Sequence, residues 1–185
     1  STFRNALPFF WTTAFGTVKK ESLTFIVGAF FDMQSVAILD LANKLVLIPR
    51  IIATSINGAL FPDIMTNSST DRVRRIMRYE TYIALIIITL IAAFGYWAVL
   101  ILGGRDLLAA YPLAIIRSIT IYTWLIVDCY IYFVFIPKNR YRLVANNQFV
   151  AMASFLLLAV CSLLFYKSLI VIVSMFTISH IVEVI

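Results

Sequence analysis

The chain has 185 residues, of which 62% are hydrophobic and only 13% are charged, and its mean hydropathy is +0.96. A soluble domain has about 25% charged residues, so too few polar side chains remain here to cover a surface exposed to water. The composition excludes a soluble domain and predicts an integral membrane protein. The net charge of +6 is attributed to basic connections between membrane helices, because the sequence has no extended basic face for nucleic acid.

Six segments have the roughly 20 mostly apolar residues that a helix needs to cross a bilayer. They are residues 6–31, 36–62, 80–102, 109–136, 147–166 and 168–185. The sequence thus predicts an all-α membrane protein with six transmembrane helices. No linker or low-complexity tract divides it, so residues 1–185 are expected to form a single domain.

The first segment has a polar patch near its middle. A continuous helix is favoured over one broken at Gly16, because neither half is long enough to span alone. The polar patch comprises Thr12, Thr13, Gly16, Lys19 and Lys20, and Glu21 follows it directly.

The second segment has a continuous polar stripe. At 100° per residue, its polar side chains fall within an arc of roughly 140°. They are Asp40, Asn43, Lys44, Arg50, Thr54 and Asn57. Asp40 and Lys44 are four residues apart, the spacing of a helical ion pair. Pro49 lacks a backbone N–H, so it predicts a kink and a hinge beside Arg50.

Basic residues in the connections divide unevenly between the two sides of the membrane. If all six helices cross, one side has eight of them and the other has two. The eight are Arg4, Arg72, Arg74, Arg75, Arg78, Lys138, Arg140 and Arg142; the two are Arg105 and Lys167. The positive-inside rule assigns the richer side to the cytoplasm. Residues 71–82 are expected either to lie at the membrane interface or to form a solvated loop that fixes the topology.

The fourth segment repeats the polar stripe, and the last segment does not. Arg117, Thr120, Trp124 and Asp128 share one helical face. His180 and Glu183, near the end of the last helix, are interpreted as interfacial residues without a functional role.

Cys129 and Cys161 lie in separate apolar runs, and the chain has a single histidine. We therefore expect neither a disulfide nor a metal site.

Charges inside apolar segments are the most informative feature of the sequence. A charge at bilayer depth costs at least about 2.5–3.5 kcal/mol, so it persists only beside a partner or a wet cavity. Five cations (Lys19, Lys20, Lys44, Arg50 and Arg117) stand against three carboxylates (Glu21, Asp40 and Asp128). Such a surplus favours a cavity that binds anions, and arginine suits phosphate. The alternative is a set of interhelical ion pairs that only fix helix register.

Two stretches resemble a known family. IVGAFFDMQSVAILDLANKLVLIPRIIATSINGALFPDI is similar to the start of the second half of polysaccharide flippases of the multidrug/oligosaccharidyl-lipid/polysaccharide exporter superfamily. ILGGRDLLAAYPLAII is similar to the family's element before its tenth helix. The family commonly has Gly-x-Tyr where this chain has Val36, Ala37 and Ile38, which leaves the branch of the superfamily open. The chain also begins at Ser1 and ends inside an apolar run, so we expect a piece of a longer protein.

The resemblance implies the C-terminal half of a twelve- or fourteen-helix exporter in the bacterial cytoplasmic (inner) membrane, working with the N-terminal half of the same polypeptide. Its implied substrate is an undecaprenyl-pyrophosphate-linked oligosaccharide, as in O-antigen, capsule, exopolysaccharide or peptidoglycan synthesis. The implied substrate-binding residues are Lys19, Lys20, Lys44, Arg50, Asn57, Arg117 and Trp124. Glu21, Asp40 and Asp128 are the candidates for binding a coupling Na⁺ or proton, and no other cofactor is implied.

The sequence leaves three alternative functions to be weighed. A multidrug exporter of the same superfamily would need surplus carboxylates rather than surplus cations. A membrane enzyme such as a glycan polymerase is disfavoured, because every outer connection is only a few residues long. A purely structural subunit requires that all the intramembrane charges pair with one another.

Overall fold

The computed structural model describes residues 2–66, 70–135 and 140–183, and in these ranges the chain is helical without any strand. The α-helices are α1 (Thr2–Phe30), α2 (Met33–Thr66), α3 (Thr70–Gly103), α4 (Ala110–Tyr130), α5 (Tyr141–Phe165) and α6 (Leu169–Val182). A 3₁₀ turn, η1 (Arg105–Leu107), precedes α4, and a π-helical turn, η2 (Ile131–Phe135), follows it. The predicted all-α class is confirmed.

Each predicted segment lies largely within one α-helix, although the bounds differ. α1 is continuous through Gly16, as expected, and α2 continues to Thr66. α3 begins at Thr70, so residues 71–82 are the first turns of α3, and the alternative that they form a loop is wrong. The reason is that apolar windows detect only the part of a helix suited to lipid, whereas the backbone stays helical through polar turns until a breaking sequence occurs.

Three of the described helical stretches are long and apolar enough to cross a membrane: Asp71–Gly103, Ala110–Phe135 and Arg142–Phe165. α6 is a shorter apolar helix. On the outside of α3, large apolar side chains such as Ile86, Phe94 and Ile101 are exposed. An apolar exterior on helices of this length is typical of a protein whose solvent is lipid.

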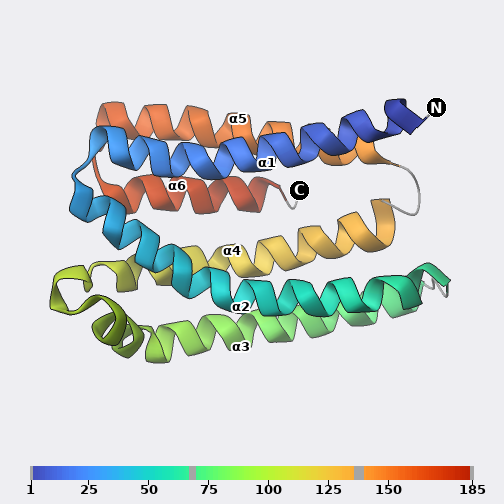
Figure 1. Cartoon of the computed structure of the whole chain (residues 1–185), viewed down its shortest axis with the longest axis horizontal. Coiled ribbons are helices and arrows are strands. Elements are labelled where there is room, and N and C mark those ends of the chain that lie inside the picture. Colours follow the sequence, from blue (N-terminus) through green and yellow to red (C-terminus); the bar gives the residue numbers. More distant parts are fainter. Residues whose placement is uncertain (1, 67–69, 136–139, 184–185) are drawn as a thin grey trace.

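The helices form two layers that run along the long axis of the molecule (Figure 1). One layer contains α1, α5 and α6, with α1 packed on α5 and α5 packed on α6. The other contains α2, α3 and α4, with α4 packed on both α2 and α3. α4 also packs on α6, and this contact joins the two layers.

Successive helices alternate in direction, which collects the basic residues at one end. The described residues that flank the α2–α3 and α4–α5 connections lie at the end where α1 begins (Figure 1). Arg72 to Arg78 in the first turns of α3, together with Arg140 and Arg142, therefore share this end. Arg105 and Lys167 lie at the opposite end. We call these the basic end and the opposite end of the bundle.

The main apolar core lies toward the opposite end. Leu23 and Val27 of α1, Leu39 of α2, Leu113 of α4 and Phe155 of α5 are all at most 2% exposed and belong to one buried cluster. Residues from the end of α1 and the beginnings of α2, α4 and α6 meet there. This apolar cluster closes the space between the layers at the opposite end, and polar residues follow it toward the basic end.

α2 changes direction part-way along its length, running obliquely at first and then parallel to α3 (Figure 1). Pro49 lies within this helix, and a proline removes the hydrogen bond that its N–H would donate to the carbonyl four residues earlier. The predicted kink at Pro49 agrees with this change of direction.

Candidate functional site

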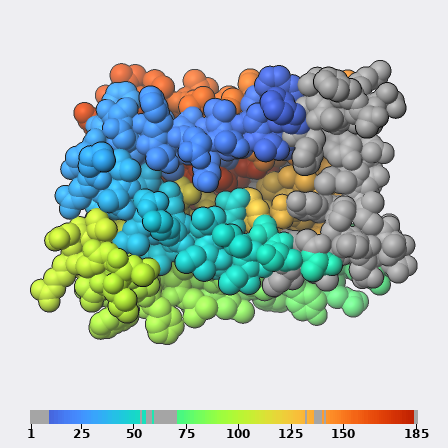
Figure 2. Space-filling model, viewed as in Figure 1, coloured from blue at the N-terminus to red at the C-terminus, as the bar shows by residue number. Residues whose placement is uncertain are grey.

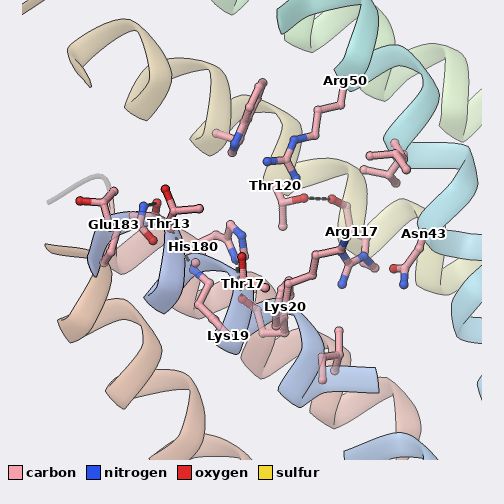
Figure 3. Close-up of a pocket in the computed structure, with 18 residues that line it drawn as sticks. Thr13, Thr17, Lys19, Lys20, Asn43, Arg50, Arg117, Thr120, His180 and Glu183 are labelled. Atoms are coloured by element: carbon pink, nitrogen blue, oxygen red, sulfur yellow. Dashed lines mark hydrogen bonds and ion pairs between the residues drawn. The ribbon is translucent and has the colours of Figure 1, made fainter. Parts of the chain in front are cut away.

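A cavity of about 430 Å³ lies between the two layers, lined by residues of α1, α2, α4, α5 and α6 (Figure 3). In the space-filling view, the surface is hollowed between α1 and α2, and atoms of α4 and α6 are visible inside (Figure 2). The polar and aromatic lining residues include Thr12, Thr13, Thr17, Lys19, Lys20, Asn43, Arg50, Arg117, Thr120, Trp124, Gln148, Phe176, His180 and Glu183.

Arg50 reaches the cavity from α2 and stacks on an aromatic ring of α4. Its guanidinium carbon lies 4.0 Å from the centroid of the Trp124 ring. Stacking holds the flat face of a guanidinium while its N–H donors stay available around the rim. Among the residues that the structure describes, Arg50 forms no ion pair.

Arg117 enters the same cavity from α4 and stacks on a ring of α6. It is 9% exposed, and its guanidinium carbon lies 4.7 Å from the centroid of Phe176. Its Nε and Nη1 atoms are buried without a hydrogen-bond partner in the described part of the chain, and so is Oδ1 of Asn43. Buried donors without partners cost about 1–3 kcal/mol each, more when charged. The cavity therefore offers charged donors that an anion would satisfy.

Among the described residues, Lys19 and Glu183 form an ion pair in which both partners line the cavity. Nζ of Lys19 lies 2.9 Å from Oε2 of Glu183, and the two side chains are 3% and 6% exposed. Gln148 of α5 donates a hydrogen bond to Oε1 of the same carboxylate. The side-chain amide of Asn147 donates to the Glu183 backbone carbonyl at 2.5 Å. Glu183 thus connects α1 and α5 to the end of α6.

Among the site residues that sequence reasoning missed, His180 and Glu183 were interpreted as interfacial, and Phe176 and Gln148 were not singled out. Nδ1 of His180 lies 3.1 Å from the carbonyl of Phe176, and the two rings are 4.6 Å apart. Phe176, His180 and Glu183 follow one another at spacings of four and three, so they share one face of α6. The same test of helical spacing that found the stripes on the second and fourth segments would have found this face.

The charge of the lining is strongly unbalanced. Four cationic side chains face one carboxylate, that of Glu183: they are Lys19, Lys20, Arg50 and Arg117. Outside the lining, the carboxylate of Asp128 also acts electrostatically on Arg50. Because charges interact more strongly where water is partly excluded, this arrangement stabilises a bound anion.

The structure brings five of the seven predicted substrate-binding residues together: Lys19, Lys20, Arg50, Arg117 and Trp124. Lys44 lies elsewhere, on the exposed side of α2, where it forms the expected ion pair with Asp40 at 2.7 Å. The side chain of Asn57 lies outside the described part of the structure.

The three predicted ion-coupling carboxylates lie apart from one another. Asp40 pairs with Lys44, and both side chains are more than half exposed. Glu21 is also exposed and lies 3.9 Å from Lys20. Asp128 is half-buried on α4, one helical turn beyond Trp124. Within the described ranges, no group of three or more His, Cys, Asp or Glu residues is arranged to hold a metal ion.

Comparisons with protein-family models, with curated proteins and with solved structures gave no match for this chain. Its class therefore follows from its own fold and cavity. Over its described residues it is an all-helical protein, with three helices there suited to crossing a membrane and a cationic cavity between two helix layers.

Proposed function

We propose that this chain is the six-helix C-terminal half of an exporter that translocates an undecaprenyl-pyrophosphate-linked oligosaccharide across the bacterial cytoplasmic membrane by alternating access. The observation that carries the proposal is the cationic cavity, with four cations facing one carboxylate. The resemblance of the VAILDLANKL and ALFPDI stretches to polysaccharide flippases supports the same conclusion. Repeated helical halves that rock around a central site are the general architecture of secondary transporters.

The two cavity arginines support a pyrophosphate as the bound anion. Arg50 and Arg117 come from different helices, and the guanidinium carbon of each lies over an aromatic ring. Their remaining N–H groups form the flat, two-pronged donor sets that match phosphate oxygens. At an effective dielectric constant of about 20, each close contact between opposite charges contributes roughly 4 kcal/mol before desolvation is subtracted.

The orientation of the bundle supports uptake of the substrate from the cytoplasm. In the proposed topology all six helices cross the membrane, and the positive-inside rule makes the basic end cytoplasmic. The apolar cluster of Leu23, Val27, Leu39, Leu113 and Phe155 closes the opposite end. A carrier that is closed on its outer side is ready to accept cargo from the inner leaflet.

The second candidate is an ion-coupled multidrug exporter of the same superfamily. A cationic drug needs carboxylates and open aromatic faces, as in cation–π recognition. In this cavity, Arg50 covers Trp124 and Arg117 covers Phe176, so cationic side chains already occupy the aromatic faces. The structural-subunit alternative requires complete charge pairing, yet both arginines lack an ion pair in the described residues.

Transport by the full-length protein in proteoliposomes tests the proposal. One set of vesicles receives a labelled polyprenyl-pyrophosphate oligosaccharide, and a second set receives a fluorescent cationic drug. We expect movement of the glycolipid alone, and we expect Arg50→Gln and Arg117→Gln to abolish it. Lys44→Gln is the matched control, because Lys44 lies outside the cavity and pairs with Asp40. Movement of the drug alone would refute the proposal.

A further inference from the structure

We propose that Glu183 is a tethered anion that occupies the Lys19 subsite of the cavity and competes with the substrate's phosphate for it. The inference rests on the proposed function, because it requires that the cavity binds an anion. It adds a residue that determines affinity, and it assigns to the buried ion pair a role in the transport cycle.

The geometry places the carboxylate where a substrate anion would bind. Lys19 lines the same cavity as Arg50 and Arg117, yet its ammonium group already has an anionic partner at 2.9 Å. The two arginines, in contrast, form no ion pair in the described part of the chain. An incoming phosphate therefore meets two arginines without an ion pair in the described residues, a lysine that is shared with Glu183, and Lys20, which lies 3.9 Å from Glu21.

The contacts of Glu183 permit an exchange of partners. Oε1 accepts a hydrogen bond from the neutral side chain of Gln148, and Asn147 holds the backbone carbonyl. These contacts do not involve Lys19, so they keep Glu183 in place when Lys19 turns to another anion. A neutral donor also leaves the carboxylate fully charged, so it still repels a phosphate nearby.

The charged groups around Glu183 come from several helices. α1 contributes Lys19 and Lys20, α2 contributes Arg50, and α4 contributes Arg117. α5 contributes the neutral amides of Asn147 and Gln148, and His180 lies on α6 itself. Glu183 is thus the only carboxylate that the described lining sets against these cations. Its removal should change anion affinity more than removal of any exposed carboxylate.

The exchange has a consequence for the transport cycle. When the substrate leaves, Lys19 pairs again with Glu183, and the charge of this lysine is then compensated without a bound anion. Moving an uncompensated charge across the bilayer costs energy, so partial neutralisation favours return of the unloaded carrier. Competition weakens substrate binding, but it also favours release on the outer side.

The test is the affinity of the full-length protein in lipid nanodiscs for inorganic pyrophosphate, measured by isothermal titration calorimetry. We expect Glu183→Gln to bind pyrophosphate about tenfold more tightly than the wild type, because removing a like charge from a partly wet site is worth about this factor. Asp40→Asn is the matched control: it removes a carboxylate from an ion pair outside the cavity and should leave the affinity unchanged. A purely structural Glu183 predicts equal or weaker binding by the variant.

The outcomes separate this inference from the proposed function. If the wild type binds pyrophosphate and folded Glu183→Gln binds it no more tightly, the competition is refuted and the anion cavity stands. If neither protein binds pyrophosphate, the anion cavity is refuted and the competition with it. If the variant does not fold, the test is an infrared difference spectrum of ¹³C-glutamate-labelled wild type, recorded with and without pyrophosphate. The exchange predicts that pyrophosphate shifts a glutamate carboxylate band, and an unchanged band refutes it.

Discussion

At the scale of single residues, the two cavity arginines differ from lysines in a way that transport can reveal. Arg50 combines a ring contact of 4.0 Å with a planar set of donors, whereas a lysine keeps the charge but lacks the two-pronged donor geometry. We expect Arg50→Lys to weaken pyrophosphate binding about tenfold, since loss of one hydrogen bond to a charged group costs about 1.5 kcal/mol. Calorimetry on nanodisc samples measures the effect. Lys44→Arg, outside the cavity, is the control, and unchanged affinity of Arg50→Lys would show that charge alone matters.

Asp32 governs the start of α2 and has a testable pH dependence. Its Oδ1 accepts a hydrogen bond of 2.8 Å from the backbone N–H of Ser35, as an N-cap residue does. Hydrogen bonding by Ser35 holds the pKa of Asp32 below its ordinary value. A lowered pKa in the folded state stabilises the protein above the unfolded-state pKa, and this stabilisation is lost as the pH falls through the lowered value.

We therefore expect Asp32→Ala to lower the thermal stability slightly at neutral pH. The difference from the wild type should shrink as the pH falls through the lowered pKa of Asp32, because the carboxyl group is then protonated in both the folded and the unfolded state. Thermal melts followed by circular dichroism at neutral and acid pH check this. Asp32→Asn, which retains a capping oxygen, should lose less than the alanine variant. An Asp32→Ala deficit of the same size at neutral and acid pH would show that the charge of Asp32 does not stabilise the start of α2.

At the scale of elements, the bend in α2 makes Pro49 a candidate hinge directly before the cavity residue Arg50. Pro49→Ala restores a backbone donor, so we expect a straighter helix, equal or higher thermal stability and slower glycolipid transport. Proteoliposome assays and melting curves measure these two effects. Pro112 lies in the first turn of α4, where proline is tolerated, so Pro112→Ala should leave the transport rate unchanged. A Pro49→Ala variant with normal transport would exclude the hinge.

The end of α3 packs tightly against its neighbours. A Cβ on Gly103 would lie 2.5 Å from Cδ2 of Leu41 and 3.0 Å from Cβ of Leu107. We expect Gly103→Ala to destabilise the protein by about 1–3 kcal/mol, since overpacking of this size requires side chains and backbone to shift. Gly28→Ala is the matched control, because its Cβ would meet only Val36 at 4.0 Å. Equal melting temperatures of the two variants would contradict the close packing.

At the scale of the whole molecule, the alternation of helix directions makes a topological prediction. If α5 crosses the membrane with the basic end in the cytoplasm, positions 142 and 168 lie on opposite sides. In a background without Cys129 and Cys161, we expect Ser168→Cys to react with a membrane-impermeant thiol reagent in intact cells. Arg142→Cys should react only after the membrane is permeabilised. Labelling of both positions from the same side would refute the proposed topology.

The sequence predicted the helical class and the polar stripes, because both depend on local periodicity. The stripe on α4 placed Arg117 and Trp124 on one face, and the structure finds both at the cavity. The pairing of Lys19 with Glu183 was beyond prediction, since the two residues are 164 positions apart and meet only after α1 and α6 enter one layer. The sequence placed Lys44 with the cavity residues, whereas the structure places it outside the cavity. Helical spacing shows which residues share a face of a helix, but it does not show which part of that face packs against a neighbouring helix.

The exposed pair of Asp40 and Lys44 determines what can lie next to α2. In hydrocarbon, two charged side chains that are 59% and 65% exposed would be strongly unfavourable, even when paired. Neither α1 nor α2 is among the described stretches that are apolar enough to cross a membrane, and the hollow seen in Figure 2 lies between them. The molecule thus has two kinds of exterior. α3 presents an apolar surface suited to lipid, whereas α1 and α2 present a more polar surface that is not suited to contact with lipid tails. If the proposed exporter is correct, we expect this second side to be the surface on which the other half of the transporter packs.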